Sequence, residues 1–107
     1  MKDAIFLGDT KDVIRGFPRD ARHEAGAQLR RVQTGLDPAD WKPMKTVGKG
    51  VREIRLRERT GAFRVIYVAT FEDAVYVLHA FQKKAQRTPQ RELDVAARRY
   101  AMLARNR

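Results

Sequence analysis

The chain has 107 residues, 43% of them hydrophobic and 34% charged, and its formal net charge is +10. This length and composition predict one globular domain over residues 1–107. The absence of cysteine excludes disulfides and thiolate chemistry, and the absence of serine excludes serine-nucleophile triads.

The positive charge is concentrated in two blocks of the sequence. Residues 42–64 and residues 83–107 each hold eight basic and two acidic side chains, whereas residues 1–41 are balanced. If the two blocks meet in the fold, they form one basic face, which is typical of proteins that bind polyanions. The alternative is that the charge only keeps the protein in solution. No apolar run reaches the roughly 18 residues of a membrane span, and no secretory signal is evident, so we expect a cytoplasmic protein.

The N-terminal third predicts a strand and two helices. Residues 4–7 are apolar enough for a short strand, and Thr10 suits the start of a helical turn that ends near Gly16. Pro18 and Gly35 then suit the start and the end of a longer helix. Its predicted inner stripe, at helical spacing, is Ala21, Ala25, Leu29 and Val32.

The remainder predicts a connector, three strands and a last helix. Residues 36–50 are rich in Pro, Gly and Asp and indicate the connector. Three strand-like runs separated by short turns favour an antiparallel meander; they are residues 51–57, 63–70 and 74–81. Thr88 and Pro89 start the last helix. The predicted fold is α+β, in the order β-α-α-β-β-β-α, with a small antiparallel sheet and the helices packed on one of its faces.

Arginine is frequent in the predicted sheet. Residues two apart in a strand share a face, so Arg55 and Arg57 lie on the same side as Glu53. Arg64 is the one charged residue within its strand-like run, and an unpaired buried charge is strongly unfavourable. Arg64 is therefore either paired with Glu53 or part of an anion site, since a guanidinium group binds phosphate through two parallel hydrogen bonds.

Three further residues are candidates for proton transfer or anion binding. His79 lies in the third strand-like run, on a face predicted to hold Val75, Val77, His79 and Phe81. It is either a general acid or base or a hydrogen-bonded core residue. Lys83 and Lys84 follow this run directly and form either part of a site or a basic surface loop.

Other chemistry is less well supported by the residues. Tyr67 and Tyr100 can stack on a base or donate a phenolic proton. Two histidines without cysteine or a carboxylate cluster give poor metal-ligand spacing. The glycines at 48, 50 and 61 fit no nucleotide-binding pattern. We therefore expect neither a metal nor a cofactor.

Two stretches resemble a known family. They are GVREIRLRERTGAFRVIYVA at residues 50–69 and DAVYVLHAFQKKAQRTPQRELDVAARRY at residues 73–100. Their specific parts are G-x-F-R-x-x-Y in the middle strand and F-x-K-K-x-x-x-T-P before the last helix, and the upstream WKPMK fits the same pattern. On these motifs, residues 40–103 resemble phage-related HigB-like toxins of the RelE/ParE superfamily.

The resemblance implies a RelE-like sheet flanked by helices and a toxin of a type II toxin–antitoxin pair. Such toxins are usually ribosome-dependent mRNA endoribonucleases that need no metal, and their partners are ribosome-bound mRNA and a cognate antitoxin. By position, Arg64 matches the arginine that clamps the scissile phosphate. The predicted catalytic set is Arg64, His79, Lys83 and Lys84, and the predicted phosphate contacts are Arg55, Arg57, Lys45, Lys49 and Arg87.

Two alternatives remain open. The same superfamily includes ParE-like toxins, which inhibit DNA gyrase by binding and are not nucleases. A phage accessory module whose arginines only contact a nucleic-acid backbone is the other alternative. One scaffold supports all of these functions, so the fold alone does not decide between them.

Overall fold

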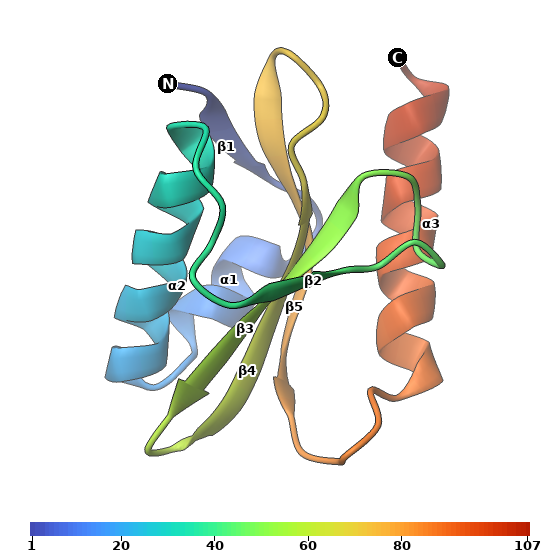
Figure 1. Cartoon of the computed structure of the whole chain (residues 1–107). Helices are drawn as coiled ribbons and strands as arrows, with labels where there is room; N and C mark the ends of the chain where they lie inside the picture. Colours follow the sequence, from blue (N-terminus) through green and yellow to red (C-terminus); the bar gives the residue numbers. More distant parts are fainter.

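The computed structural model describes residues 1–107 and contains one five-stranded sheet with helices on both sides (Figure 1). The strands are β1 (Asp3–Phe6), β2 (Trp41–Pro43), β3 (Val51–Glu58), β4 (Gly61–Val68) and β5 (Ala74–Lys83). The helices are α1 (Thr10–Arg15), α2 (Arg19–Gln33) and α3 (Gln90–Arg105). This is an α+β fold, as the sequence predicts. None of the three helices is both long and apolar enough to cross a membrane.

The sheet has the strand order β1-β5-β4-β3-β2. β3, β4 and β5 form the predicted antiparallel meander, and β2 adds to it in antiparallel orientation. β1 pairs with β5 in parallel, so the sheet is mixed and the prediction of a wholly antiparallel sheet is wrong. The predicted connector also contains β2, a strand of only three residues that exists because its backbone pairs with Arg52–Ile54 of β3.

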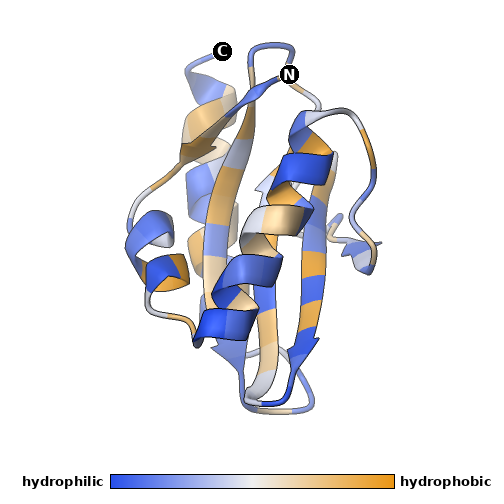
Figure 2. Ribbon diagram, turned by 90° about the vertical axis from the view of Figure 1, so that its left-hand side faces the viewer, coloured by the Kyte–Doolittle hydropathy of each residue, from blue (hydrophilic) through white to orange (hydrophobic).

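The helices cover both faces of the sheet, so the prediction that they pack on one face is also wrong. The inner stripe of α2 packs with β3, β4 and β5 through Ile54, Leu56, Phe63, Val65, Tyr67, Val75, Val77 and Ala80. The inner side of α3 packs on the opposite face against Val51, Ile66, Val68, Ala74, Tyr76, Leu78 and Phe81. A sheet that is apolar on both faces must be covered on both. In Figure 2 the outer surface of α2 is mainly hydrophilic, and hydrophobic bands lie on the strands behind it.

A β-bulge in β5 changes which residues face which helix. Ile66 of β4 lies opposite His79, and the next residue, Tyr67, lies opposite Val77, so Leu78 is an extra residue. Leu78 packs on the α3 face, and so does Ile66 of β4. His79 lies opposite Ile66, so His79 and Phe81, two residues later, are on the α3 face as well. The predicted common face of Val75, Val77, His79 and Phe81 is therefore wrong: the first two face α2 and the last two face α3.

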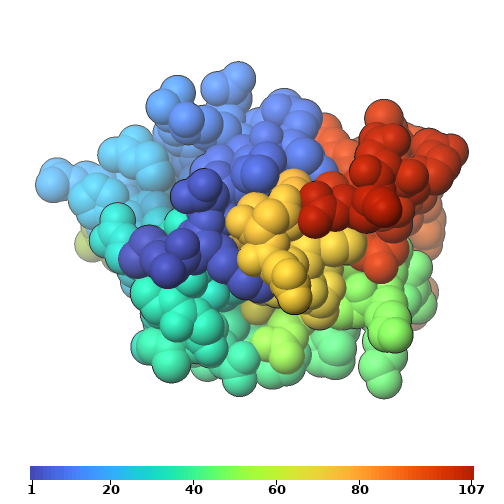
Figure 3. Space-filling view, turned by 90° about the horizontal axis from the view of Figure 1, so that it is seen from above, coloured from blue at the N-terminus to red at the C-terminus, as the bar shows by residue number.

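Both ends of the chain are tied to the turn between β4 and β5, as Figure 3 shows from above. The ammonium of Lys2 donates hydrogen bonds to the backbone carbonyls of Ala69 and Phe71, each at 2.7 Å. Arg107 binds the carboxylate of Asp73 through both terminal nitrogens, at 2.7 and 3.0 Å. These polar contacts add to the apolar packing of Phe71 against the core residues on the α3 face, and together they hold the turn.

Ile54→Ala should lower the free energy of unfolding by about 2–5 kcal/mol, because it leaves a cavity in a closely packed region. Ile54 has no exposed surface and lies on the face of β3 that α2 covers. The matched control is Ile5→Ala on the edge strand β1, where the side chain is 40% exposed. This control should cost less than about 1 kcal/mol. Urea denaturation measures both losses, and equal losses would contradict the assignment of Ile54 to the core.

Candidate nucleic-acid interface

Three strands bring arginine and lysine side chains together on the α3 face. Arg55 of β3 lies opposite Arg64 of β4. In the next row Arg57 lies opposite Ala62, and Ala62 lies opposite Lys83 of β5. Side chains directly opposite in antiparallel strands share a face, with Cβ atoms about 4.5–5.5 Å apart. The two basic blocks of the sequence therefore meet, as one basic face requires.

A groove of about 490 Å³ opens beside these rows. Its lining residues are Lys42, Met44, Lys83, Gln86, Arg87, Thr88, Gln90 and Leu93. Helix α3 begins at Gln90 on the wall of the groove, so the positive end of the helix dipole lies there as well. We call the six cations of the rows and the groove the cationic face: Lys42, Arg55, Arg57, Arg64, Lys83 and Arg87.

Arg64 is paired with Glu53 inside this face. The two side chains are almost fully buried, and Arg64 Nε lies 3.6 Å from Glu53 Oε1. Arg64 Nη1 also donates a hydrogen bond to the backbone carbonyl of Phe63 at 3.0 Å. Burial raises the pKa of the Glu53 carboxyl, and the neighbouring charges, led by Arg64 and Lys42, act against that rise. The ion pair is one of the two possibilities that the sequence left open for Arg64, and it holds Arg64 in the centre of the cationic face.

Two buried polar atoms next to this ion pair have no hydrogen-bond partner. They are Glu53 Oε2 and Arg55 Nε. An unpaired buried polar atom typically costs about 1–3 kcal/mol, so such atoms are few in folded proteins. Both atoms lie beneath the accessible surface, so hydrogen-bonding capacity is left unused next to the pair of Glu53 and Arg64.

Lys83 is the residue of the cationic face best suited to exchange a proton. Its Nζ donates a hydrogen bond to the backbone carbonyl of Gln86 at 2.5 Å. Desolvation lowers the pKa of the Lys83 ammonium, the charges of Arg64 and Lys42 lower it further, and Glu53 opposes them. A lysine with a lowered pKa exchanges its proton nearer neutral pH, whereas an arginine stays protonated.

His79 lies beneath α3 and is held by residues of that helix. Its Nε2 lies 2.7 Å from Glu92 Oε1, and its Nδ1 lies 3.5 Å from Arg99 Nη1. The ring is 7% exposed and stacks on Phe81. Both ring nitrogens are thus engaged, which is the hydrogen-bonded core arrangement that the sequence left open as one of two possibilities.

The predicted catalytic residue Lys84 and the remaining predicted phosphate contacts divide into two groups. Arg87 lines the groove, and Lys84 is exposed directly after β5. Lys45 and Lys49 are exposed on the segment between β2 and β3. The backbone carbonyl of Lys49 accepts a hydrogen bond from the Tyr100 hydroxyl at 3.2 Å. Tyr100 lies ten residues after the start of α3, which corresponds to about 15 Å along the helix, so Lys49 is not brought into the cationic face.

One cation of the site, Lys42, was not predicted as a member of it. Lys42 lies in β2 opposite Glu53, and only the unpredicted pairing of β2 with β3 brings it to the groove. Tyr67, by contrast, is 1% exposed and faces α2, so it does not reach the groove. No group of three or more His, Asp or Glu side chains is placed to hold a metal ion together.

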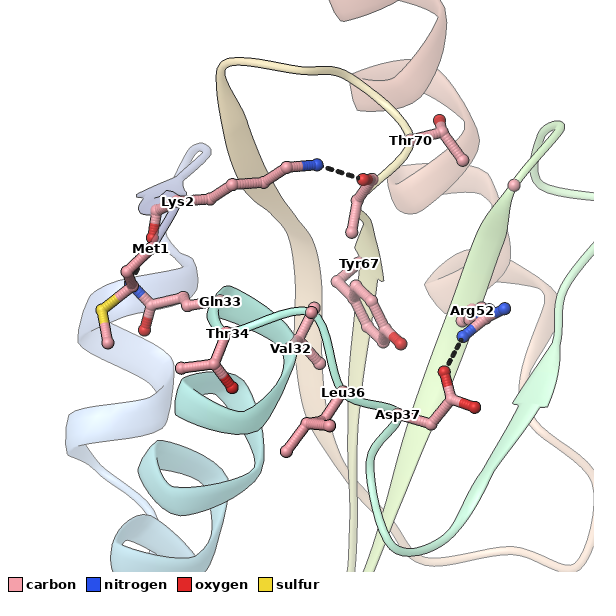
Figure 4. Close-up of a pocket in the computed structure, with 13 residues that line it drawn as sticks. Met1, Lys2, Val32, Gln33, Thr34, Leu36, Asp37, Arg52, Tyr67 and Thr70 are labelled. Carbon is pink, nitrogen blue, oxygen red and sulfur yellow. Dashed lines mark hydrogen bonds and ion pairs between the residues drawn. The ribbon is translucent and has the colours of Figure 1, made fainter.

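A larger cavity of about 650 Å³ lies on the α2 face, near the end of that helix. Figure 4 shows that its cations are already engaged. Arg52 pairs with Asp37 at 2.8 Å and stacks on Trp41, and Lys2 binds backbone carbonyls. The cationic face is the better candidate for an anion site although its groove is smaller, because most of its charges have no carboxylate partner.

Arg64→Gln should destabilise the protein by about 3–5 kcal/mol, because it leaves the buried Glu53 carboxylate without its partner. The double variant Glu53→Gln/Arg64→Gln should lose less than the sum of the two single variants, with a coupling energy of about 0.5–3 kcal/mol. Urea denaturation of all four proteins gives this cycle. Strictly additive losses would contradict a stabilising contact between the two groups.

A comparison with models of known protein families identifies the family of the chain. The family model described as "Phage derived protein Gp49-like (DUF891)" matches residues 12–101, which include α2, all of β2 to β5 and most of α3. None of the curated proteins compared with the chain matches it. The chain therefore belongs to the phage-derived Gp49-like family, which is in general a family of RelE/HigB-like toxins.

Proposed function

We propose that this protein is a HigB-like toxin of a type II toxin–antitoxin system that cleaves mRNA on the ribosome without a metal ion. The observation that carries the proposal is the arrangement of the cationic face. Arg55 and Arg64 are directly opposite one another, and Lys83 stands in the neighbouring row with a lowered pKa. The family of the chain and the motifs around Arg64 and Lys83 support the same function.

In the proposed reaction the ribose 2′-oxygen attacks the adjacent phosphorus and the bond to the 5′-oxygen breaks. Arg55 and Arg57 bind the phosphate oxygens, and the buried charge of Arg64 helps them to stabilise the additional negative charge of the transition state. The ammonium of Lys83 donates its proton to the leaving 5′-oxygen, while solvent takes the proton of the 2′-hydroxyl. The products are a 2′,3′-cyclic phosphate and a free 5′-hydroxyl.

The other predicted catalytic and binding residues take supporting parts in this proposal. Arg87 and Lys84 extend the positive surface along the RNA backbone beyond the groove. His79 reaches RNA only if its contacts with Glu92 and Arg99 break, so we assign it a positioning part between β5 and α3. Lys45 and Lys49 add long-range attraction for a polyanion rather than direct contacts with the scissile phosphate.

The proposal also defines the partners and the compartment. An mRNA-cleaving toxin acts where ribosomes are, so we propose a cytoplasmic location. Its activity must be neutralised in the cell by a cognate antitoxin, which would cover or distort the cationic face.

Lys83→Met and Arg55→Gln should each abolish growth arrest and mRNA cleavage when the chain is expressed without an antitoxin. A loss of 100-fold or more is on the order expected for a residue that transfers a proton or stabilises a transition-state charge. The measurement maps 5′ ends of cellular mRNA. Arg59→Gln is the matched control, since Arg59 is an exposed arginine at the β3–β4 turn. These variants avoid the folding penalty that Arg64 substitutions carry.

Other results of this expression experiment would contradict the proposal. Growth arrest with intact mRNA and accumulating DNA damage would replace the proposal with gyrase inhibition. The absence of toxicity, together with salt-sensitive RNA or DNA binding, would replace it with a backbone-binding module. Cleavage that is lost equally in Arg59→Gln would show that net charge, and not the geometry of the cationic face, controls activity.

The Lys83 ammonium should titrate below the ordinary lysine value of about 10.4. Desolvation and the charges of Arg64, Lys42 and Arg55 all favour the neutral amine. Arg55→Gln removes one of these charges, so it should move the titration midpoint of Lys83 upward. Heteronuclear NMR of lysine side chains, with Lys83→Met to assign the signal, measures both midpoints. An unchanged midpoint in Arg55→Gln would contradict the electrostatic coupling of the two residues.

A further inference from the structure

The outer side of α3 carries a row of arginines that the cationic face does not use. Arg91, Arg98 and Arg105 are exposed and follow one another at intervals of seven residues. Seven residues advance about 10.5 Å and nearly two turns along a helix, so the three side chains form one stripe about 21 Å long. The side of α3 that packs on the sheet consists of Leu93, Ala96, Ala97, Tyr100 and Leu103. The stripe therefore points away from the sheet.

The three arginines have no partner within the protein. The ion pairs of the structure involve other cations: Arg52, Arg64, His79, Arg99 and Arg107. The two acidic residues of α3 are engaged elsewhere, Glu92 with His79 and Asp94 with the side-chain amide of Gln90. The outer side of α3 thus presents three arginines at a regular spacing, none of them in an ion pair.

Apolar residues alternate with these arginines. Met102 is 56% exposed, and Val95 is half-buried seven residues before it. Together the five residues follow alternating steps of four and three, from Arg91 through Val95, Arg98 and Met102 to Arg105. This is the a/d spacing of a helix that contacts another helix, with apolar residues at a and arginines at d. We call these five residues the α3 seam.

We propose that the α3 seam binds an amphipathic helix of a partner protein that carries carboxylates at heptad spacing. Arginine and carboxylate groups form two parallel hydrogen bonds, so the pair requires both opposite charge and a defined orientation of the two groups. Met102 offers a flexible apolar contact that accommodates different side chains. Such a contact favours a partner with apolar side chains over a hydrated phosphate backbone. The seam faces away from the sheet that carries the cationic face, so this binding is independent of the proposed nuclease activity.

The test uses a fluorescent 21-residue helical peptide with Leu and Glu at the two heptad positions and neutral residues elsewhere. Its control has the same composition with Leu and Glu moved off the heptad. Fluorescence anisotropy with the full chain measures the affinity. Arg91→Gln/Arg98→Gln/Arg105→Gln should weaken binding of the heptad peptide about tenfold or more. Met102→Ser should weaken it about threefold without any change of charge.

The matched control removes three exposed arginines elsewhere, Arg15→Gln/Arg19→Gln/Arg30→Gln, and should change the affinity less than about twofold. Circular dichroism verifies that all variants keep the same melting behaviour. Equal losses in the two triple variants, or equal binding of the two peptides, would overturn the proposal. It would also be overturned if the α3 triple variant lost affinity for a 12-nucleotide RNA while Met102→Ser bound the peptide normally, because the stripe would then be a nucleic-acid contact.

Discussion

A buried carboxylate makes the cationic face compatible with a folded sheet. Glu53 stands in the middle of that face and is 1% exposed, and its nearest charged partner is Arg64. Like charges a few ångströms apart repel strongly where water is partly excluded, so a cluster of arginines on adjacent strands needs an internal counter-charge. One carboxylate is enough to hold Arg64 in place and too little to neutralise its neighbours. The result is a surface that is anchored and still strongly positive.

The same packing that stabilises the sheet also leaves this surface open. Helices α2 and α3 cover the two faces because β4 and β5 carry apolar rows on both sides. β5 ends at Lys83 and α3 begins only at Gln90, so the helix covers the region before the end of the strand, and a groove lies where its cover stops. The apolar rows of the sheet lie under α3, and the charged rows that contain Arg55 and Arg57 lie on the part of the same face beyond the helix.

Local signals predicted most of the elements. The helix expected between Pro18 and Gly35 is α2. The last helix is expected to start with Thr88 and Pro89, and α3 starts at Gln90, with Pro89 as its N-cap. The short turn expected between the first two strand-like runs separates β3 from β4, and β4 begins at Gly61, whose φ of +140° other residues rarely adopt. Turn and cap residues act over a few positions, so one sequence is enough to recognise them.

What the sequence did not predict depends on contacts between distant segments. Strand β2 has three residues, one of them a proline, and no periodicity from which a strand can be read. The parallel pairing of β1 with β5 joins residues about 70 positions apart. Face sharing by alternate residues correctly grouped Arg55 with Arg57, but it did not place Arg64 opposite Arg55, because strand register depends on the partner strand. The engagement of His79 by Glu92 requires α3 to lie across β5, which no local pattern indicates.

The bulge at Leu78 sets the side on which everything after it in β5 emerges. In a regular strand, odd-numbered and even-numbered side chains point to opposite faces of the sheet. One inserted residue exchanges these two faces for all later residues of the strand. Val77 and Lys83 are both odd-numbered, yet one faces α2 and the other lies on the α3 face with Arg57. Without the extra residue at Leu78, the ammonium of Lys83 would lie on the α2 face, away from Arg57. The side of the sheet on which Lys83 emerges is thus fixed five residues earlier, at Leu78.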